Sequence, residues 1–120
     1  MENIYSKDVK KILNSVQERL SNTAVDSEER AFEIIAREVF EYSKLNGCTN
    51  DYLMMKKIIK KIYYKTRTKL NILQPLIDDD QITEIMVNGY DQIFYEKNNI
   101  IKRYDISFDN NEEVIDVLQS

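Results

Sequence analysis

Three groups of side chains in this sequence could do chemistry: a row of carboxylates, a run of amines and a single thiol. The carboxylates are Asp78, Asp79 and Asp80, which could offer oxygen ligands to a cation. Magnesium and calcium sites, however, need oxygen ligands that arrive from several directions. Three neighbouring residues of one loop do not provide this, and we interpret the triplet as a solvated bend between two elements.

The amines lie between positions 56 and 69, where basic residues occur without an acidic one. They are Lys56, Lys57, Lys60, Lys61, Lys65, Arg67 and Lys69. Such a strip could bind nucleic acid or an anionic lipid surface, where each charge contributes about 1 kcal/mol. The alternative, which we favour, is a solvated helix face, because Tyr63 and Tyr64 alone do not make a stacking platform for bases.

The remaining candidates carry less information. Glu84 and Glu96 should face each other across a hairpin, but both stand at outward positions without an acid or base partner, so we expect them to serve solubility. Cys48 is the only cysteine and cannot form an internal disulfide. With no second cysteine and no histidine, it cannot belong to a zinc site either.

The residues that the sequence lacks exclude most enzyme classes. It has no histidine, so mechanisms that use imidazole as a base, proton shuttle or metal ligand are excluded. Its glycines are Gly47 and Gly89 alone, so neither a GxxxxGK[ST] nor a GxGxxG phosphate-binding loop can be written. We predict no catalytic, cofactor-binding or metal-binding residue in these 120 residues.

Composition predicts a folded chain with two electrostatically different parts. The chain has 120 residues, of which 42% are hydrophobic and 32% charged, as in globular domains. Residues 1–69 hold 14 basic and 10 acidic residues, whereas residues 70–120 hold 3 and 11. We expect the two parts to meet different partners or each other.

The sequence shows no sign of export or membrane insertion. No apolar stretch of signal-peptide length opens it, and no run approaches the roughly 20 apolar residues that span a bilayer. A single cysteine gives no indication of an oxidising compartment. We therefore predict a cytoplasmic protein.

Three apolar stripes at helical spacing precede residue 70 and predict three helices. The first follows a cap at Ser6 and ends near Asn22, the second follows a capping box at Asp26 with Glu29 and stops at Asn46-Gly47, and the third follows a cap at Thr49 or Asn50 and ends between Thr66 and Asn71. Each stripe implies that the helix buries one face against its neighbours.

After residue 70 the periodicity changes from helical to alternating. Pro75 suits the first turn of a short helix over Leu73–Asp78, because its missing amide hydrogen would be unbonded there anyway. Strands are predicted over residues 83–87, 92–96 and 100–104, with tight turns at Asn88-Gly89 and Asn98-Asn99. A last helix opens at a second capping pattern, Asp109 with Glu112.

These elements define an α+β fold. A three-helix lead-in over residues 1–69 precedes residues 70–120, which form a short helix, a three-stranded antiparallel meander and a C-terminal helix. Three strands with one helix make a thin sheet that normally packs against a further layer. The apolar stripe of the last helix still runs at Ser120, so we expect an incomplete domain.

The segments LQPLIDD (residues 73–79), ITEIMVNG (82–89) and IFYE (93–96) together carry a family resemblance. They resemble the N-terminal domain of type II/type IV secretion-system ATPases, in particular the CpaF type that powers tight-adherence (Tad/Flp) pilus assembly. The resemblance covers residues 70–120, and residues 1–69 match only as the family's usual helical lead-in. Asn71-Ile72 replaces a usual Gly-Pro, Asp80 a common Pro and Tyr90 a usual Pro, departures that concern loop geometry.

The resemblance implies the non-catalytic region of a hexameric motor at the inner membrane. In that family this region sits on a RecA-like core that binds ATP and magnesium, moves against the core, and helps to close the nucleotide cleft with residues of its sheet. The implied partners are further copies of the chain and the inner-membrane platform proteins of a secretion or pilus system. The core's Walker motifs and its acidic and histidine boxes have no counterpart here, so this chain should be inactive alone.

One alternative of another class stays open. The excess of positive charge before residue 70 is compatible with a stand-alone interaction or nucleic-acid-binding module that uses the basic third helix. The sequence favours the motor region, and nucleic acid is the less favoured partner.

Overall fold

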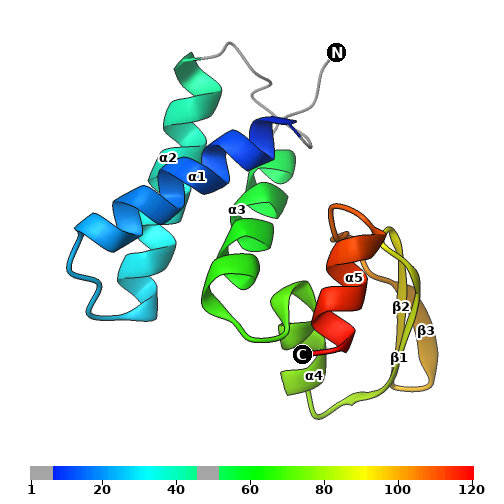
Figure 1. Ribbon diagram of the computed structural model, residues 1–120. Coiled ribbons are helices and arrows are strands. Elements are labelled where there is room, and N and C mark those ends of the chain that lie inside the picture. Colours follow the sequence, from blue (N-terminus) through cyan, green and yellow to red (C-terminus); the bar gives the residue numbers. More distant parts are fainter. Residues whose placement is uncertain (1–6, 46–51) are drawn as a thin grey trace. The chain divides into compact units, whose positions relative to one another are not determined.

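The computed structural model describes residues 7–45 and 52–120 and confirms the α+β class (Figure 1). The elements in chain order are α1 (Lys7–Asn22), α2 (Glu28–Leu45), α3 (Tyr52–Arg67), a 3-10 turn η1 (Asn71–Leu73), α4 (Gln74–Asp78), β1 (Ile82–Gly89), β2 (Gln92–Lys97), β3 (Ile100–Arg103) and α5 (Asn111–Leu118). The chain divides into two compact units, Met1–Thr66 and Arg67–Ser120. We call them the helical unit and the sheet unit.

The helical unit is held together by the apolar stripes that its sequence predicts. Helix α1 packs against α2, and α3 completes a common core. Its buried members are Val9, Ile12, Val16, Ile35, Val39, Met55, Ile58, Ile59 and Ile62. Burying one such side chain contributes roughly 1.5–3 kcal/mol. The core therefore stabilises helices that would be only marginally stable in isolation.

The start of α2 differs by one residue from the prediction. Ser27, and not Asp26, caps the helix, because its hydroxyl accepts a hydrogen bond from the Arg30 amide at 3.1 Å. Serine and aspartate are about equally good at this position, so local preference alone does not separate them. The predicted cap at Ser6, the stop at Asn46-Gly47 and the cap at Thr49 or Asn50 lie outside the described residues.

The segment that joins helix to strand is built as predicted, with one addition. Pro75 lies in the first turn of α4, and a 3-10 turn over residues 71–73 precedes that helix. Asn71 has a φ of 57° in the left-handed region. Its Oδ1 accepts a hydrogen bond from the Ile72 amide at 2.7 Å, so the side chain stabilises the turn that its backbone makes.

The sheet is the predicted antiparallel meander, in the order β1-β2-β3. The second tight turn is confirmed, since Asn98 and Asn99 have φ of 54° and 65°. The first is wrong, because Asn88 and Gly89 belong to β1 and the chain reverses at Tyr90-Asp91. The ladder explains the difference: Val87 pairs with Ile93 and Gly89 with Gln92, with a register shift between them, which leaves only two residues for the loop.

One face of the sheet carries the core of the sheet unit. Ile93 is buried from β2, and Phe108 and Val114 are buried from the segment and helix that follow β3. The Tyr104 hydroxyl donates to the Ile72 carbonyl at 2.8 Å and so ties the end of the meander to η1. Figure 1 shows α4 and α5 on the same side of the sheet.

Helix α5 is capped one residue later than predicted. Asn110 Oδ1 accepts from the Glu113 amide at 2.9 Å, and Glu113 Oε1 accepts in turn from the Asp109 amide at 2.9 Å. The predicted pairing of Asp109 with Glu112 is therefore wrong by one residue, and Glu113 reaches back to the amide of Asp109, the residue before the cap.

Candidate functional site

The sheet presents a second face that α4 and α5 do not cover. Alternation along the paired strands places Glu84, Met86, Phe94, Glu96, Ile101 and Arg103 on this face, opposite the buried Ile93. We call these six residues the open sheet face. Within residues 67–120, all of which the structure describes, no helix lies over it (Figure 1).

The open sheet face combines apolar side chains with charged ones held in place by contacts. Ile101 is 61% exposed, and the Arg103 guanidinium lies 5.9 Å from the centre of the Phe94 ring. Arg103 also donates to the Asp91 carbonyl at 2.8 Å, which fixes its position. Exposed apolar side chains next to ordered charged groups are typical of protein contact surfaces.

The edge of this face is the free strand β3. All four of its residues are exposed, among them Ile100 and Ile101. Its only ladder partner among the described residues is β2. The backbone N–H and C=O groups along its other edge therefore have no strand partner within the sheet.

The structure brings the two predicted carboxylates together. Glu84 and Glu96 are direct partners in the β1–β2 ladder. Glu96 accepts a hydrogen bond from the Thr83 hydroxyl at 2.8 Å, and Glu84 is exposed. No acid or base among the described residues pairs with Glu84. Like charges placed opposite each other slightly destabilise a sheet. The two carboxylates are therefore best explained as solvated surface groups.

The acidic triplet forms the predicted bend only in part, because Asp78 ends α4 and Asp79 and Asp80 lead into β1. Asp79 also has a partner that the sequence did not reveal. Lys97 Nζ lies 2.9 Å from Asp79 Oδ2, and the Gln81 amide donates to Asp79 Oδ1 at 2.9 Å. The hydrogen bond from Lys97 lowers the pKa of Asp79 and raises the pKa of Lys97. Among the described residues, no cluster of His, Cys, Asp or Glu is arranged to hold a metal ion.

The basic run does not form one exposed strip. Lys56 and Lys60 are exposed on α3, but Lys61 is only 3% exposed. Lys56 lies over the Tyr52 ring, 5.6 Å from its centre. The basic side chains therefore do not form a continuous anion-binding track. Lys56 and Lys60 lie on a solvated helix face as predicted, whereas the buried Lys61 departs from that prediction.

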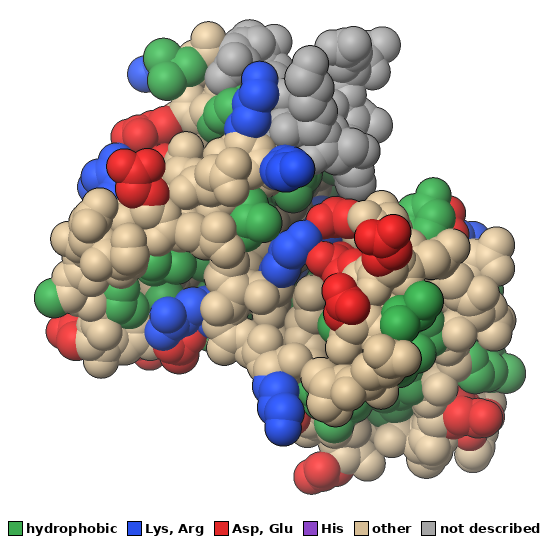
Figure 2. Space-filling model, in the orientation of Figure 1, with side chains coloured by type: hydrophobic (Ala, Val, Ile, Leu, Met, Phe, Trp, Pro, Cys, Tyr) green, Lys and Arg blue, Asp and Glu red, His purple; other side chains and the backbone are tan. Residues whose placement is uncertain are grey.

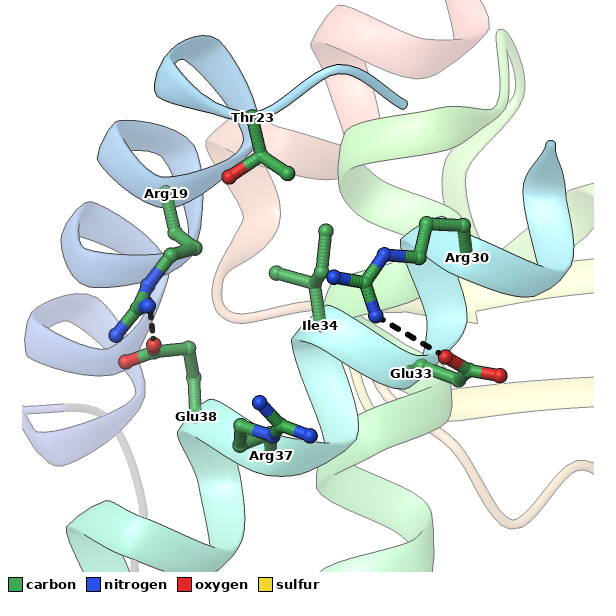
Figure 3. A pocket seen from close by; sticks show the side chains of 7 residues that line it. All are labelled: Arg19, Thr23, Arg30, Glu33, Ile34, Arg37 and Glu38. Atoms are coloured by element: carbon green, nitrogen blue, oxygen red, sulfur yellow. Dashed lines mark hydrogen bonds and ion pairs between the residues drawn. The ribbon is translucent and has the colours of Figure 1, made fainter. Parts of the chain in front are cut away.

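A small cavity of about 50 Å³ between α1 and α2 gathers three guanidinium groups (Figure 3). Arg19 pairs with Glu38 at 3.0 Å and Arg30 with Glu33 at 3.2 Å. Arg37 completes the lining. The Arg19–Glu38 pair joins α1 to α2, whereas Arg30 and Glu33 both belong to α2. Because two of the three cations already have a carboxylate partner, the cluster has little charge left for an anion.

Acidic side chains gather over α5 in the sheet unit (Figure 2). This helix carries Glu112, Glu113 and Asp116, and Glu112 and Glu113 lie in its first turn. Carboxylates there interact favourably with the positive end of the helix dipole. Part of the acidic excess of residues 70–120 thus stabilises this helix.

The sequence matches no model of a known protein family and no curated protein. Within the described residues, no helix is long and apolar enough to cross a membrane.

Proposed function

We propose that this chain is the N-terminal, non-catalytic region of a hexameric, CpaF-like secretion or pilus-assembly ATPase. In this proposal it couples ATP hydrolysis in a RecA-like core to protein secretion or pilus assembly. The protein is cytoplasmic and reaches the inner membrane through platform proteins. ATP and magnesium belong to the core, and this region supplies contacts.

The backbone at Asn71 is the observation that carries the proposal. This position departs from the resembled family, which usually has glycine there, and its φ is 57°. Glycine is the default residue for the left-handed region, and asparagine is among the few side chains that tolerate it. The departure therefore preserves the conformation for which glycine is used, and so supports the resemblance.

The departure at Tyr90 has a local compensation. The Tyr90 amide donates to Asn111 Oδ1 at 3.1 Å, and its carbonyl accepts from the Phe108 amide at 2.9 Å. A proline, usual at this place in the family, has no amide hydrogen and could not make the first bond. Here a hydrogen bond to α5 restrains the hairpin loop that proline would stiffen.

The open sheet face supplies the contact that a coupling region needs. In the resembled family, residues of this sheet help to close the nucleotide cleft of the core. The exposed Ile101 and the Arg103–Phe94 pair, with Glu84 and Glu96 beside them, offer a mixed apolar and charged surface for that docking.

The coding frame beyond Ser120 gives the first test. We expect a Walker A motif within roughly a domain's length, about 150 residues. The full-length protein should then form hexamers and hydrolyse ATP with magnesium, and residues 1–120 alone should not. A frame without such a motif, or ATP hydrolysis by the 120-residue chain, would remove the proposal.

Nucleic-acid binding through α3 is less well supported, because Lys61 is buried. A titration with duplex DNA at increasing salt concentration distinguishes nucleic-acid binding from the motor proposal. Tight binding with a steep salt dependence would replace the motor proposal, whereas absence of binding at low salt would leave it standing.

A further inference from the structure

The helical unit contains an aromatic hollow that the proposed function does not use. It lies between the first turns of α2 and the second half of α3 and has a volume of about 530 Å³, within the range of ligand pockets. We call it the α2–α3 hollow. Its lining residues are Glu28, Glu29, Phe32, Glu33, Lys60, Tyr63 and Tyr64.

Three aromatic rings form a continuous wall of the hollow. Phe32 and Tyr63 meet edge to face with ring centres 5.7 Å apart, and Tyr63 and Tyr64 do the same at 5.6 Å. Phe32 is 42% exposed. The Tyr63 hydroxyl lies 3.3 Å from Glu28 Oε1, which orients the central ring. The wall is thus held in place and accessible from solvent.

Charge decides what this wall can bind. The hollow is lined by three glutamates and one lysine, and helical spacing sets Glu29 and Glu33 one turn apart on the same ridge of α2. Arg30 already pairs with Glu33 and offsets part of its charge, whereas the Glu29 side chain shows no hydrogen bond or ion pair with the described residues. A negative rim around aromatic faces repels phosphate and attracts a cation.

We propose that the α2–α3 hollow binds an arginine side chain within a basic peptide segment of a partner protein. A planar guanidinium can stack on an aromatic ring and donate to two carboxylates at once, which a compact ammonium cannot do as well. The inference needs neither a nucleotide nor a motor core. It therefore stands or falls separately from the proposed function.

The test uses the whole chain and a defined probe, the acetylated and amidated peptide Arg-Gly-Arg-Gly-Arg carrying a fluorescent dye. Its affinity is followed by fluorescence anisotropy at low salt. The control peptide has citrulline in place of each arginine, which keeps the shape and removes the charge. We expect the citrulline peptide to bind at least about tenfold more weakly.

Two variants locate the binding. Glu29→Gln and Phe32→Ala should each weaken the arginine peptide roughly three- to tenfold. Glu41→Gln, an exposed change on the same helix outside the hollow, should leave the affinity unchanged. Because Glu29 is exposed, its substitution should not unfold the protein, and circular dichroism checks this for each variant.

Three results would overturn the inference. Equal affinity for both peptides would show that charge is not recognised. An affinity that Glu29→Gln and Phe32→Ala leave unchanged would place the binding elsewhere. Arginine amide that competes as tightly as the peptide would make the hollow a small-molecule site and not a peptide site.

Discussion

Lys97 Nζ lies 2.9 Å from Asp79 Oδ2, so the last residue of β2 is tied to the bend that precedes β1. Ile82 and Lys97 are partners at the open end of the hairpin, and the ion pair fastens that end across the bend. About a third of each side chain remains exposed, so solvent screens the attraction. The pair therefore sets geometry more than it adds stability.

Asp79→Asn should lower the urea midpoint of unfolding slightly at neutral pH. The folded pKa of Asp79 lies below its ordinary value of 3.8, so its contribution is present above that value and is lost as the pH falls through the folded pKa. The difference between wild type and variant should accordingly shrink when the measurement is repeated near pH 3. The matched control is Asp80→Asn, an exposed change one residue along, which should leave the urea midpoint at neutral pH nearly unchanged.

The same pair responds to base in the opposite sense. The folded pKa of Lys97 lies above its ordinary value of 10.5, so its contribution is present below that value and is lost as the pH rises through the folded pKa. Lys97→Met should remove this alkaline loss from the urea midpoint profile. An unchanged profile in the variant would mean that the pair is not formed in solution.

Tyr104→Phe should destabilise the protein by about 1 kcal/mol, because it deletes the 2.8 Å hydrogen bond to the Ile72 carbonyl and leaves the ring packing in place. Urea unfolding followed by circular dichroism measures the change. The control, Tyr90→Phe, removes a hydroxyl for which the described structure shows no hydrogen bond. A loss as large in the control would show that the effect is not specific to η1.

Asn110→Ala should cost about 1 kcal/mol and speed hydrogen exchange at the Glu113 amide, which loses its cap. Asn110→Asp keeps an oxygen acceptor and should restore both values. If the aspartate variant exchanges as fast as the alanine variant, the capping geometry is not the cause.

Ile35→Ala should cost about 2–5 kcal/mol, because the side chain is fully buried in the core of the helical unit and its removal leaves a cavity. Leu45→Ala serves as the control on the same helix, since Leu45 is 84% exposed and should change the free energy of unfolding by less than about 0.5 kcal/mol. Thermal unfolding of the two variants side by side gives the comparison.

Local signals predicted the elements well and their junctions less well. Asn98-Asn99 is recognisable as a turn because asparagine tolerates a positive φ, and both residues have one in the structure. Asn88-Gly89 has the same local preference, yet the ladder between β1 and β2 extends to Gly89 and moves the turn to Tyr90-Asp91. Strand pairing is non-local, so the turn signal alone could not place the reversal.

The candidate surfaces were harder to predict for the same reason. Tyr63 and Tyr64 were visible within the basic run, but Phe32, which completes their wall, comes from another helix. Asp79 likewise finds its partner in Lys97 at the far end of a hairpin. The sequence shows which residue types are present, whereas the contacts between residues of different elements depend on how helices and strands pack.

The free strand β3 has a consequence for behaviour at high concentration. Ile100 and Ile101 give it the apolar, strand-forming character that favours growth of a sheet from molecule to molecule. Its four-residue length and the charges of Lys102 and Arg103 oppose that growth. The two basic side chains thus act as gatekeepers, and neutralising them would turn the open edge of a small sheet into a template for aggregation.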